Sequence, residues 1–389
     1  MNLPMQAAAE LARRAGVPAS VHIDLLSACD LDCVHCYLAD RTDRGMTTGQ
    51  YVGLLDELAD MGVFHLLFSG GELFLRRDTM TILRHARKRR FVVKLITHAG
   101  RVTEEVADEL AAIGIGEVGV SLYSMVAQDH EAVTRRPGSH ARTVAGIRRL
   151  RERDLIVQLK IPVMQANRDS WHTVLPFARE LGCTFSVSHK IHARDDRINA
   201  GDAFDPDDVT HLNVSFQDKV DVRLLVLQES IRQGRPDFHL DPARRLDRHP
   251  CGAGLTYAYI GPDGSVRPCV TFLQDMGNVR AQSFGEIWFG SAEMQSVREI
   301  TKRSFSECQD CAFVRECGHC IGIQHQERGD PTKRSELVCG DTHARFAAAA
   351  KAGLYSGPTG PPGTVPRRTG PPPCAVAPGA VGGCAVADL

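Results

Sequence analysis

The feature that most constrains the fold is a regular alternation of short β-rich runs with helical segments between Val21 and Ile191. The runs read VHIDLLSAC, FHLLFSGGE, KLITHAG, EVGVSLYS, VQLKIPV and CTFSVSHKI. Repeated β-then-α units form parallel sheets with right-handed crossovers and helical covers. The pattern therefore predicts an α/β fold built on a partial, TIM-like (β/α)6 barrel. In such barrels the chemistry lies at the carboxyl ends of the strands.

Local signals support the helices of this pattern. The segment MTTGQYVGLLDELADMG predicts a helix, because Thr47 and Gln50 fit a capping box. Its apolar residues recur on one helical face and are Tyr51, Leu54, Leu55 and Leu58. A second helix is expected to begin after Thr103, an N-cap residue, and to stop near Gly114.

Composition excludes several classes of function. A net charge of -1 over 389 residues gives no overall attraction to nucleic acid or to an anionic membrane. No apolar run approaches the roughly 20 residues of a membrane span. The first twenty residues contain Glu10, Arg13 and Arg14 and lack the hydrophobic core of a secretory signal. We therefore expect a cytoplasmic protein.

Cysteine is the most informative residue type. Ten of the 13 cysteines form two groups: Cys29, Cys33 and Cys36, and then Cys251, Cys269, Cys308, Cys311, Cys317, Cys320 and Cys339. Stable disulfides are rare in the cytosol, so clustered thiols indicate metal. Closed zinc and iron–sulfur sites use four protein ligands. The first group has three, which leaves one metal position open for chemistry.

These patterns divide the chain into five segments. We expect an N-terminal extension at 1–17, the partial barrel at 18–235, a polar connector at 236–250 and a cysteine-rich domain at 251–345. Residues 346–389 contain the end of a helix and then a tail rich in Pro and Gly, which predicts disorder. A small domain poor in periodic segments can be held together by metal clusters rather than by a core.

The stretch CDLDCVHCY, followed after the next strand by SGGE at 69–72, resembles the radical S-adenosylmethionine (SAM) superfamily over residues 18–235. The resemblance implies that Cys29, Cys33 and Cys36 hold a 4Fe-4S cluster. It further implies that SAM occupies the open iron and is cleaved reductively to a 5′-deoxyadenosyl radical, which abstracts a hydrogen atom. The cofactor supplies this chemistry and the protein positions it.

The same resemblance implies residues that contact SAM. Glu72 would accept from the ammonium group, Ser121 would bind a ribose hydroxyl, and an arginine would pair with the carboxylate. The full set is Tyr37, Gly70, Gly71, Glu72, Ser121, Arg135 and Arg136. Two positions depart from the family pattern, since Leu73 replaces a common proline and His98 replaces a common asparagine. Neither change removes a cluster ligand.

The second cysteine group resembles the SPASM extension of some radical SAM enzymes. The resemblance implies two auxiliary 4Fe-4S clusters, one held by Cys308, Cys311, Cys317 and Cys339 and the other by Cys251, Cys269 and Cys320. Tyr257 stands where some relatives carry a further cysteine, so the fourth ligand of the second cluster stays open. Paired C-x2-C spacings also suit structural zinc, which is the alternative.

The resemblance favours a maturase that cross-links, epimerises or oxidises a ribosomally made peptide or protein side chain. A leader-binding partner could present that substrate, and a flavodoxin or ferredoxin would supply electrons. The alternatives are radical SAM chemistry on a small molecule, such as a sugar alcohol or tetrapyrrole, and a non-catalytic zinc scaffold. Lys160 and His189 are either substrate contacts or satisfied wall residues. The run RHARKRR at 84–90 is either a docking site for an acidic peptide or RNA, or a solvated helix face.

Overall fold

The computed structural model describes residues 10–191, 193–195, 210–234, 238–240 and 245–365. Within them runs one nine-stranded sheet of order β6-β5-β4-β3-β2-β1-β7-β8-β9. Its first six strands in the sequence are parallel and confirm the predicted α/β class. They are β1 (Ser20–Asp24), β2 (His65–Ser69), β3 (Val92–Thr97), β4 (Glu117–Ser121), β5 (Val157–Pro162) and β6 (Thr184–Ser188).

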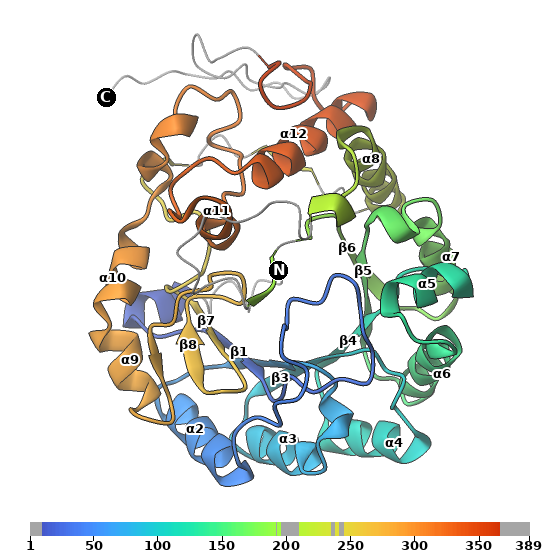
Figure 1. Ribbon diagram of the computed structural model, residues 1–389, viewed down its shortest axis with the longest axis vertical. Coiled ribbons are helices and arrows are strands. Elements are labelled where there is room, and N and C mark those ends of the chain that lie inside the picture. The colour runs from blue at the N-terminus through green and yellow to red at the C-terminus, as the bar shows by residue number, and fades with distance from the viewer. Residues whose placement is uncertain (1–9, 192, 196–209, 235–237, 241–244, 366–389) are drawn as a thin grey trace.

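Helices cover the outer side of this curved sheet (Figure 1). They are α2 (Thr48–Asp60), α3 (Thr79–Lys88), α4 (Glu104–Ile113), α5 (Ala127–Thr134), α6 (Ser139–Glu152) and α7 (Val174–Glu180). The predicted capping box of α2 is present, with Thr47 and Gln50 bonded reciprocally. Thr103 caps α4, and Gly114 ends that helix in the left-handed conformation at φ 75°. All four predicted core residues of α2 are buried.

The cysteine-rich segment joins the barrel sheet instead of standing apart from it. Strand β7 (Tyr257–Ile260) pairs in parallel with β1, and β8 (Ser265–Arg267) and β9 (Gly277–Asn278) follow in antiparallel order. Sequence periodicity does not show which strands pair over more than 200 residues, so this continuity was not predicted. Helix α9 (Phe284–Gly290) then contacts α2, where the Gly285 amide donates to Glu57 at 2.8 Å.

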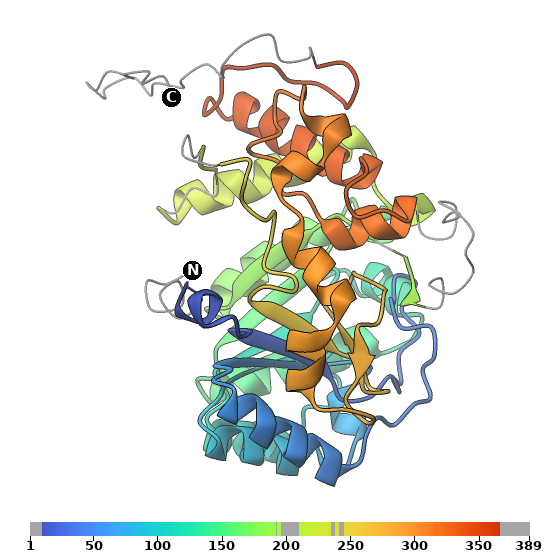
Figure 2. The same cartoon turned by 90° about the vertical axis from the view of Figure 1, so that its left-hand side faces the viewer.

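The remaining helices close the ring on the side opposite the parallel sheet (Figures 1 and 2). They are α8 (Phe216–Arg232), α10 (Ala292–Glu299), α11 (Ile321–Arg328) and α12 (Glu336–Lys351). Helix α8 begins after Ser215, whose side chain forms a capping box with Asp218. The predicted disorder of the tail concerns mostly residues from 366 onward, which lie outside the described range. No described helix is long and apolar enough to cross a membrane.

The parallel strands have one apolar and one polar face. Strands β3 and β5 alternate buried and half-buried residues, as expected when one face packs under helices and the other faces the barrel interior. On β6 the three residues Thr184, Ser186 and Ser188 are exposed. The interior face is therefore polar and, along β6, open to solvent.

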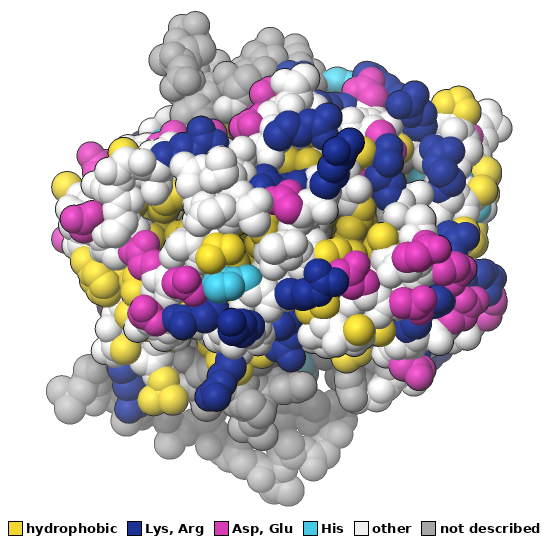
Figure 3. All heavy atoms as spheres, turned by 90° about the horizontal axis from the view of Figure 1, so that it is seen from below, with side chains coloured by type: hydrophobic (Ala, Val, Ile, Leu, Met, Phe, Trp, Pro, Cys, Tyr) yellow, Lys and Arg dark blue, Asp and Glu magenta, His cyan; other side chains and the backbone are white. Residues whose placement is uncertain are grey.

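The basic run at 84–90 covers the end of α3 and the two residues after it, and several of its charges are paired with acidic neighbours. Arg84 pairs with Glu109, and Arg89 and His85 both pair with Asp56. Figure 3, which looks onto α2, α3 and α4, shows both charge signs mixed across this surface. A mixed, paired surface supports the solvated-face interpretation over a docking site for RNA or an acidic peptide.

Candidate functional site

The first cysteine group lies in the loop after β1, at the carboxyl edge of the parallel sheet. Backbone hydrogen bonds tie this loop to the end of α5, with the Asp32 amide donating to Thr134 at 3.0 Å and the Val34 amide to Val133 at 2.9 Å. The loop is thus anchored at the position that the barrel topology predicts for chemistry.

The three thiols of this loop face one another. Burial raises the pKa of Cys33 to about 12, and the like charges of Cys36 and Cys29 add to the shift. Burial also raises the pKa of Cys36. Three buried thiolates close to one another are unfavourable without a counter-charge. A bound cationic centre removes this penalty, because coordination deprotonates thiols outright.

The spacing of the thiols fits a cluster better than a single ion. Within the described chain, the only three-residue group with ligand atoms all within 4.8 Å of one another is Cys29, Asp30 and His98. A tetrahedral zinc with Zn–S near 2.3 Å would bring its sulfurs to about 3.8 Å. No three cysteines of either group meet even the wider limit. No three described cysteines therefore form a preformed site for a single ion, and the choice between clusters and zinc rests on the sequence motifs.

The glycine pair of SGGE brings the end of β2 against the cysteine loop. A Cβ on Gly70 would lie 2.2 Å from the Leu26 carbonyl oxygen, and one on Gly71 would lie 2.1 Å from that of Ala28. Gly70 also has φ 127°, which side chains rarely adopt. The close approach seen here is between two chain segments. A contact of these glycines with SAM stays a prediction.

Glu72, the predicted ammonium acceptor, is fully buried. Thr97 donates to both of its carboxylate oxygens at 2.8 Å, and the Phe74 amide donates at 3.2 Å. His98 lies beside it, with Nε2 at 3.1 Å from Glu72 and 2.9 Å from Asp30. The departure at position 98 therefore links Glu72 to the cysteine loop. Any contact of Glu72 with SAM would compete with these partners.

The predicted arginines lie on the outer flank of the cysteine loop. Arg136 donates to the Asp30 carbonyl at 3.0 Å, and Arg135 lies 3.5 Å from the Asp32 carboxylate. Ser121 ends β4 and lies two residues before Tyr123, whose hydroxyl is 3.9 Å from the Cys33 sulfur. The structure thus brings Ser121, Arg135 and Arg136 close to the triad loop. Their roles toward SAM stay predictions.

Tyr37 belongs to a buried network that sequence reasoning missed. Its hydroxyl donates to Asp24 Oδ2 at 2.6 Å, and the Tyr259 hydroxyl donates to the same atom at 2.8 Å. His22 Nε2 lies 3.1 Å from Asp24 Oδ1, and its Nδ1 lies 3.0 Å from the Tyr257 hydroxyl. Asp24 is fully buried. The signal that could have revealed it is the pair of polar residues two apart in the apolar strand VHIDLL.

This network connects the two cysteine groups. Tyr37 follows Cys36 directly, and Tyr257 interacts electrostatically with Cys269. Burial raises the pKa of Tyr37 well above its usual value, and the Asp24 carboxylate raises it further. Tyr37 and Tyr259 are the two tyrosines that donate to Asp24. Strand β1, the triad loop and β7 are joined through one carboxylate.

The seven C-terminal cysteines separate into the two predicted sets. Burial raises the pKa of Cys308 to about 12, and the neighbouring charges of Cys339 and Cys311 add to it. Cys317 has a pKa of about 12 for the same reasons, and it interacts with Cys308, Cys311 and Cys339. The other set is Cys251, Cys269 and Cys320, which interact with one another. The structure brings each set together, and the ligand roles stay predictions.

Each set has polar neighbours that suit a bound cluster. Thr271 lies 3.2 Å from the Cys269 sulfur and 3.9 Å from that of Cys320. Thr342 lies 3.3 Å from the Cys317 sulfur. Hydroxyl donors near sulfur are among the features that set cluster potentials.

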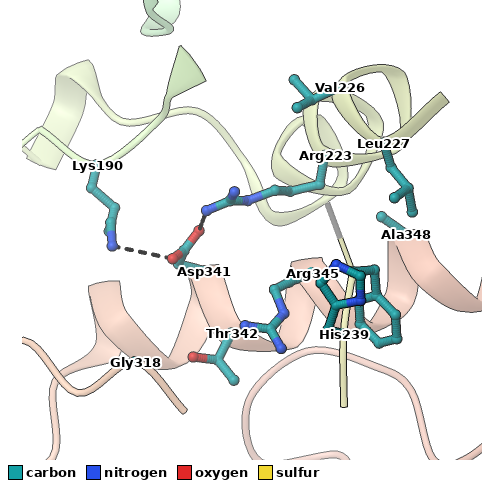
Figure 4. A pocket seen from close by; sticks show the side chains of 11 residues that line it. Lys190, Arg223, Val226, Leu227, His239, Gly318, Asp341, Thr342, Arg345 and Ala348 are labelled. Carbon is teal, nitrogen blue, oxygen red and sulfur yellow. Dashed lines mark hydrogen bonds and ion pairs between the residues drawn. The ribbon is translucent and has the colours of Figure 1, made fainter. Parts of the chain in front are cut away.

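A pocket of about 290 Å³ lies between α8 and α12, close to the set that contains Cys317 (Figure 4). Asp341 pairs there with Lys190 at 3.2 Å and with Arg223 at 2.5 Å. Buried His189 lies 2.8 Å from the same carboxylate. His189 thus contacts Asp341 through Nε2, and the choice between a substrate contact and a wall residue stays open for it.

Comparison with known proteins agrees with the geometry. The sequence model of the radical SAM superfamily matches residues 23–177, and that of the SPASM iron–sulfur cluster-binding domain matches residues 251–312. The chain contains a radical SAM domain and a SPASM domain. The predicted cofactors, a SAM-binding 4Fe-4S cluster and auxiliary clusters, agree with these two domains.

Two curated relatives of this protein cover most of its length. It is 25% identical over 331 residues to the AdoMet-dependent heme synthase of Methanosarcina barkeri, spanning 80% of this chain and 94% of the relative. It is 28% identical over 314 residues to the mycofactocin maturase MftC of Mycolicibacterium smegmatis, spanning 77% of each. Streptococcus suis SuiB has the same fold, with a TM-score of 0.65 at 17% identity over 86% of this chain and 79% of that one.

Proposed function

We propose that this protein modifies a side chain or backbone carbon of a ribosomally made peptide. The observation that carries the proposal is the assembly of ten cysteines into one three-thiol loop at the barrel edge and two further sets beside it. Supporting it, MftC is named a maturase, and SuiB has been solved bound to a precursor peptide. The exposed polar face of β6 offers room for an extended chain.

When bound, the triad cluster and SAM supply an electron and a radical able to abstract a hydrogen atom. The chain's own residues position that chemistry. The triad loop is held by the end of α5, by the glycine pair and by the Asp24 network. His98, which directly follows β3, contacts both Glu72 and Asp30 of the loop and so holds the loop against the sheet. The interior strand faces present the substrate to this edge.

The proposed function also implies partner proteins and a cellular location. We infer a flavodoxin or ferredoxin as the reductant, because iron–sulfur clusters at low potential need such a donor. A leader-peptide-binding protein is a further inferred partner, and nucleic acid and membrane are not. The cytoplasm is the inferred location, since the eleven described cysteines are all free thiols.

The test is co-expression with small peptides encoded near the gene, followed by mass spectrometry of each peptide and measurement of 5′-deoxyadenosine. We expect one peptide to change mass only with wild type. Cys33→Ala should abolish both signals. Cys183→Ala is the matched control, because this half-buried thiol belongs to neither group. Unchanged peptides with normal SAM cleavage would refute the peptide substrate.

A second candidate is oxidation or rearrangement of a small molecule. The observation favouring it is the match to the heme synthase, which is covered over 94% of its length. Incubation of the reconstituted protein with iron porphyrins, followed by mass spectrometry, distinguishes the small-molecule function from the peptide function. Loss of mass from a porphyrin with no change in any peptide would select this alternative.

A further inference from the structure

Lys160 has a setting that distinguishes it from the other charged residues of the barrel interior. It lies on β5 in register with Ser121 of β4 and Ser186 of β6. Ser121 is the last residue of β4, so Lys160 lies near the carboxyl edge of the sheet, where the cysteine loop also lies. Its side chain belongs to the half-buried set that faces the interior.

The neighbouring strand makes room for this lysine. Gly119 lies in the middle of β4, and a Cβ there would be 3.2 Å from Lys160 Cε and 3.3 Å from Ile96 Cγ1. A Cβ at position 119 would crowd the end of the Lys160 side chain, which would have to shift by a few tenths of an ångström. Glycine within a strand costs stability and often marks a close approach, so this position is suited to the lysine.

The charges around Lys160 do not balance. Lys94 of β3 pairs with Glu117 of β4 at 3.2 Å, which uses the one acidic group near both lysines. Within the described residues, no carboxylate lies within 4.0 Å of the Lys160 ammonium and no hydrogen bond from it is present. Burial lowers the pKa of Lys160, and Lys94 lowers it further against the opposite effect of Glu117.

Other charged or titratable groups of the interior contact groups of opposite sign or hydrogen-bond donors of this chain. Asp24 receives two tyrosine hydroxyls, and Glu72 receives Thr97. His189, considered together with Lys160 from the sequence, is buried against Asp341. Lys160 is thus a cation on the interior strand face that the described residues leave without an anion. A half-buried cation without a partner is a binding site for one.

We propose that Lys160 binds a carboxylate of the substrate inside the barrel. The substrate class is therefore a peptide that presents an acidic side chain or a free carboxyl terminus to β5. Ser186, exposed in register with Lys160, offers a second donor to the same carboxylate. This inference rests on the proposed peptide function, and it assigns the substrate chemistry that the same site accepts.

The test measures binding without turnover. Reconstituted protein with SAM is acetylated by a limiting amine reagent, and the rate at Lys160 is read by peptide mass spectrometry. The probes are an acetylated pentapeptide amide with a central glutamate, its glutamine counterpart, the all-alanine peptide with a free carboxyl terminus, and glutarate. Lys94 is the internal reference, because it is already paired with Glu117.

We expect the glutamate peptide or the free-terminus peptide to slow acetylation of Lys160 roughly tenfold at saturation relative to the glutamine peptide, as for a charge-assisted contact. Which of the two protects identifies the source of the carboxylate. In direct binding, Lys160→Met should remove the preference for carboxylate over amide, and Lys160→Arg should retain it. Iron content and circular dichroism of both variants check that they are folded.

Equal acetylation with every probe would overturn the inference. So would a preference for carboxylate that survives in Lys160→Met. Failure of the proposed peptide reaction would give a different result from failure of the carboxylate site. If carboxylates protect Lys160 and no neighbouring peptide ever changes mass, the carboxylate site stands and the peptide reaction falls. Protection by glutarate alone would then assign the site to a small carboxylate substrate.

Discussion

The Asp24 network supports a quantitative prediction about how strand β1 holds the cysteine loop. Tyr37 and Tyr259 donate to the same carboxylate oxygen at 2.6 and 2.8 Å, in a site where Asp24 is fully buried. A hydrogen bond to a charged group contributes about 1.5–3 kcal/mol. Removing both donors leaves the carboxylate with His22 as its remaining side-chain contact.

The expected energies are not additive. Tyr37→Phe or Tyr259→Phe alone should lower the opening free energy of β1 by about 1–2 kcal/mol, because the other tyrosine still donates to the carboxylate. The double variant should cost about 4–5 kcal/mol, since a buried charge stripped of its partners costs about 3–5 kcal/mol. The excess is an interaction energy of about 1 kcal/mol or more.

The assay is native-state hydrogen exchange of the β1 amides in the reconstituted protein, which reports opening free energies without reversible unfolding. In an Asp24→Asn background the effect of Tyr259→Phe should shrink, because the buried charge is gone. Single and double changes that add within about 0.5 kcal/mol would refute the shared-acceptor account. Retention of the coupling in Asp24→Asn would refute the role of the charge.

Three further predictions concern the glycine pair, the auxiliary set and pH. Gly71→Ala should destabilise the protein by about 3 kcal/mol or more, with a lower melting temperature and loss of triad iron, because its Cβ would lie 2.1 Å from the Ala28 carbonyl oxygen. Cys308→Ala should lower iron by roughly four per chain in an iron assay, and Cys183→Ala should leave it unchanged. Burial lowers the pKa of His130 to about 3 from 6.5, so its imidazole stays neutral in the fold and takes up a proton on unfolding below pH 6.5. Stability should therefore fall as pH drops from 6.5 toward 3, more steeply than in His130→Gln by up to about 1.4 kcal/mol per pH unit in denaturant titrations.

Local signals in the sequence were sufficient for much of the fold and for the thiol groups. The Thr47 capping box and the Gly114 helix stop depend on residues three or four apart, so spacing reveals them directly. The short spacing of Cys29, Cys33 and Cys36 identified the first group for a similar reason, whereas the division of the other seven cysteines into two sets came from the resemblance to the SPASM extension. The six parallel strands followed from their alternation with helices.

The spacing of residues in the sequence could not show which distant strands pair with each other. Strand β7 joins β1 across more than 200 residues, and nothing in either segment specifies that partner. The Asp24 network depends on this pairing, because Tyr259 reaches the carboxylate only when β7 lies beside β1. Glu72 was expected to face SAM from its motif. Its partners Thr97 and His98 come from the next strand and only the three-dimensional structure shows them.

The distribution of partners separates charges that maintain the fold from charges available to a ligand. Asp24, Glu72 and Asp341 are carboxylates whose donors all come from this chain, and each joins segments far apart in sequence. Removing such a group should loosen the site before it changes what the site binds. Lys160 differs, since its neighbours provide space and hydroxyls without a counter-charge. Replacing Lys160 should change the preference for a carboxylate ligand with little effect on stability. Stability and binding measurements can therefore distinguish the residues that hold the barrel together from those that contact the substrate.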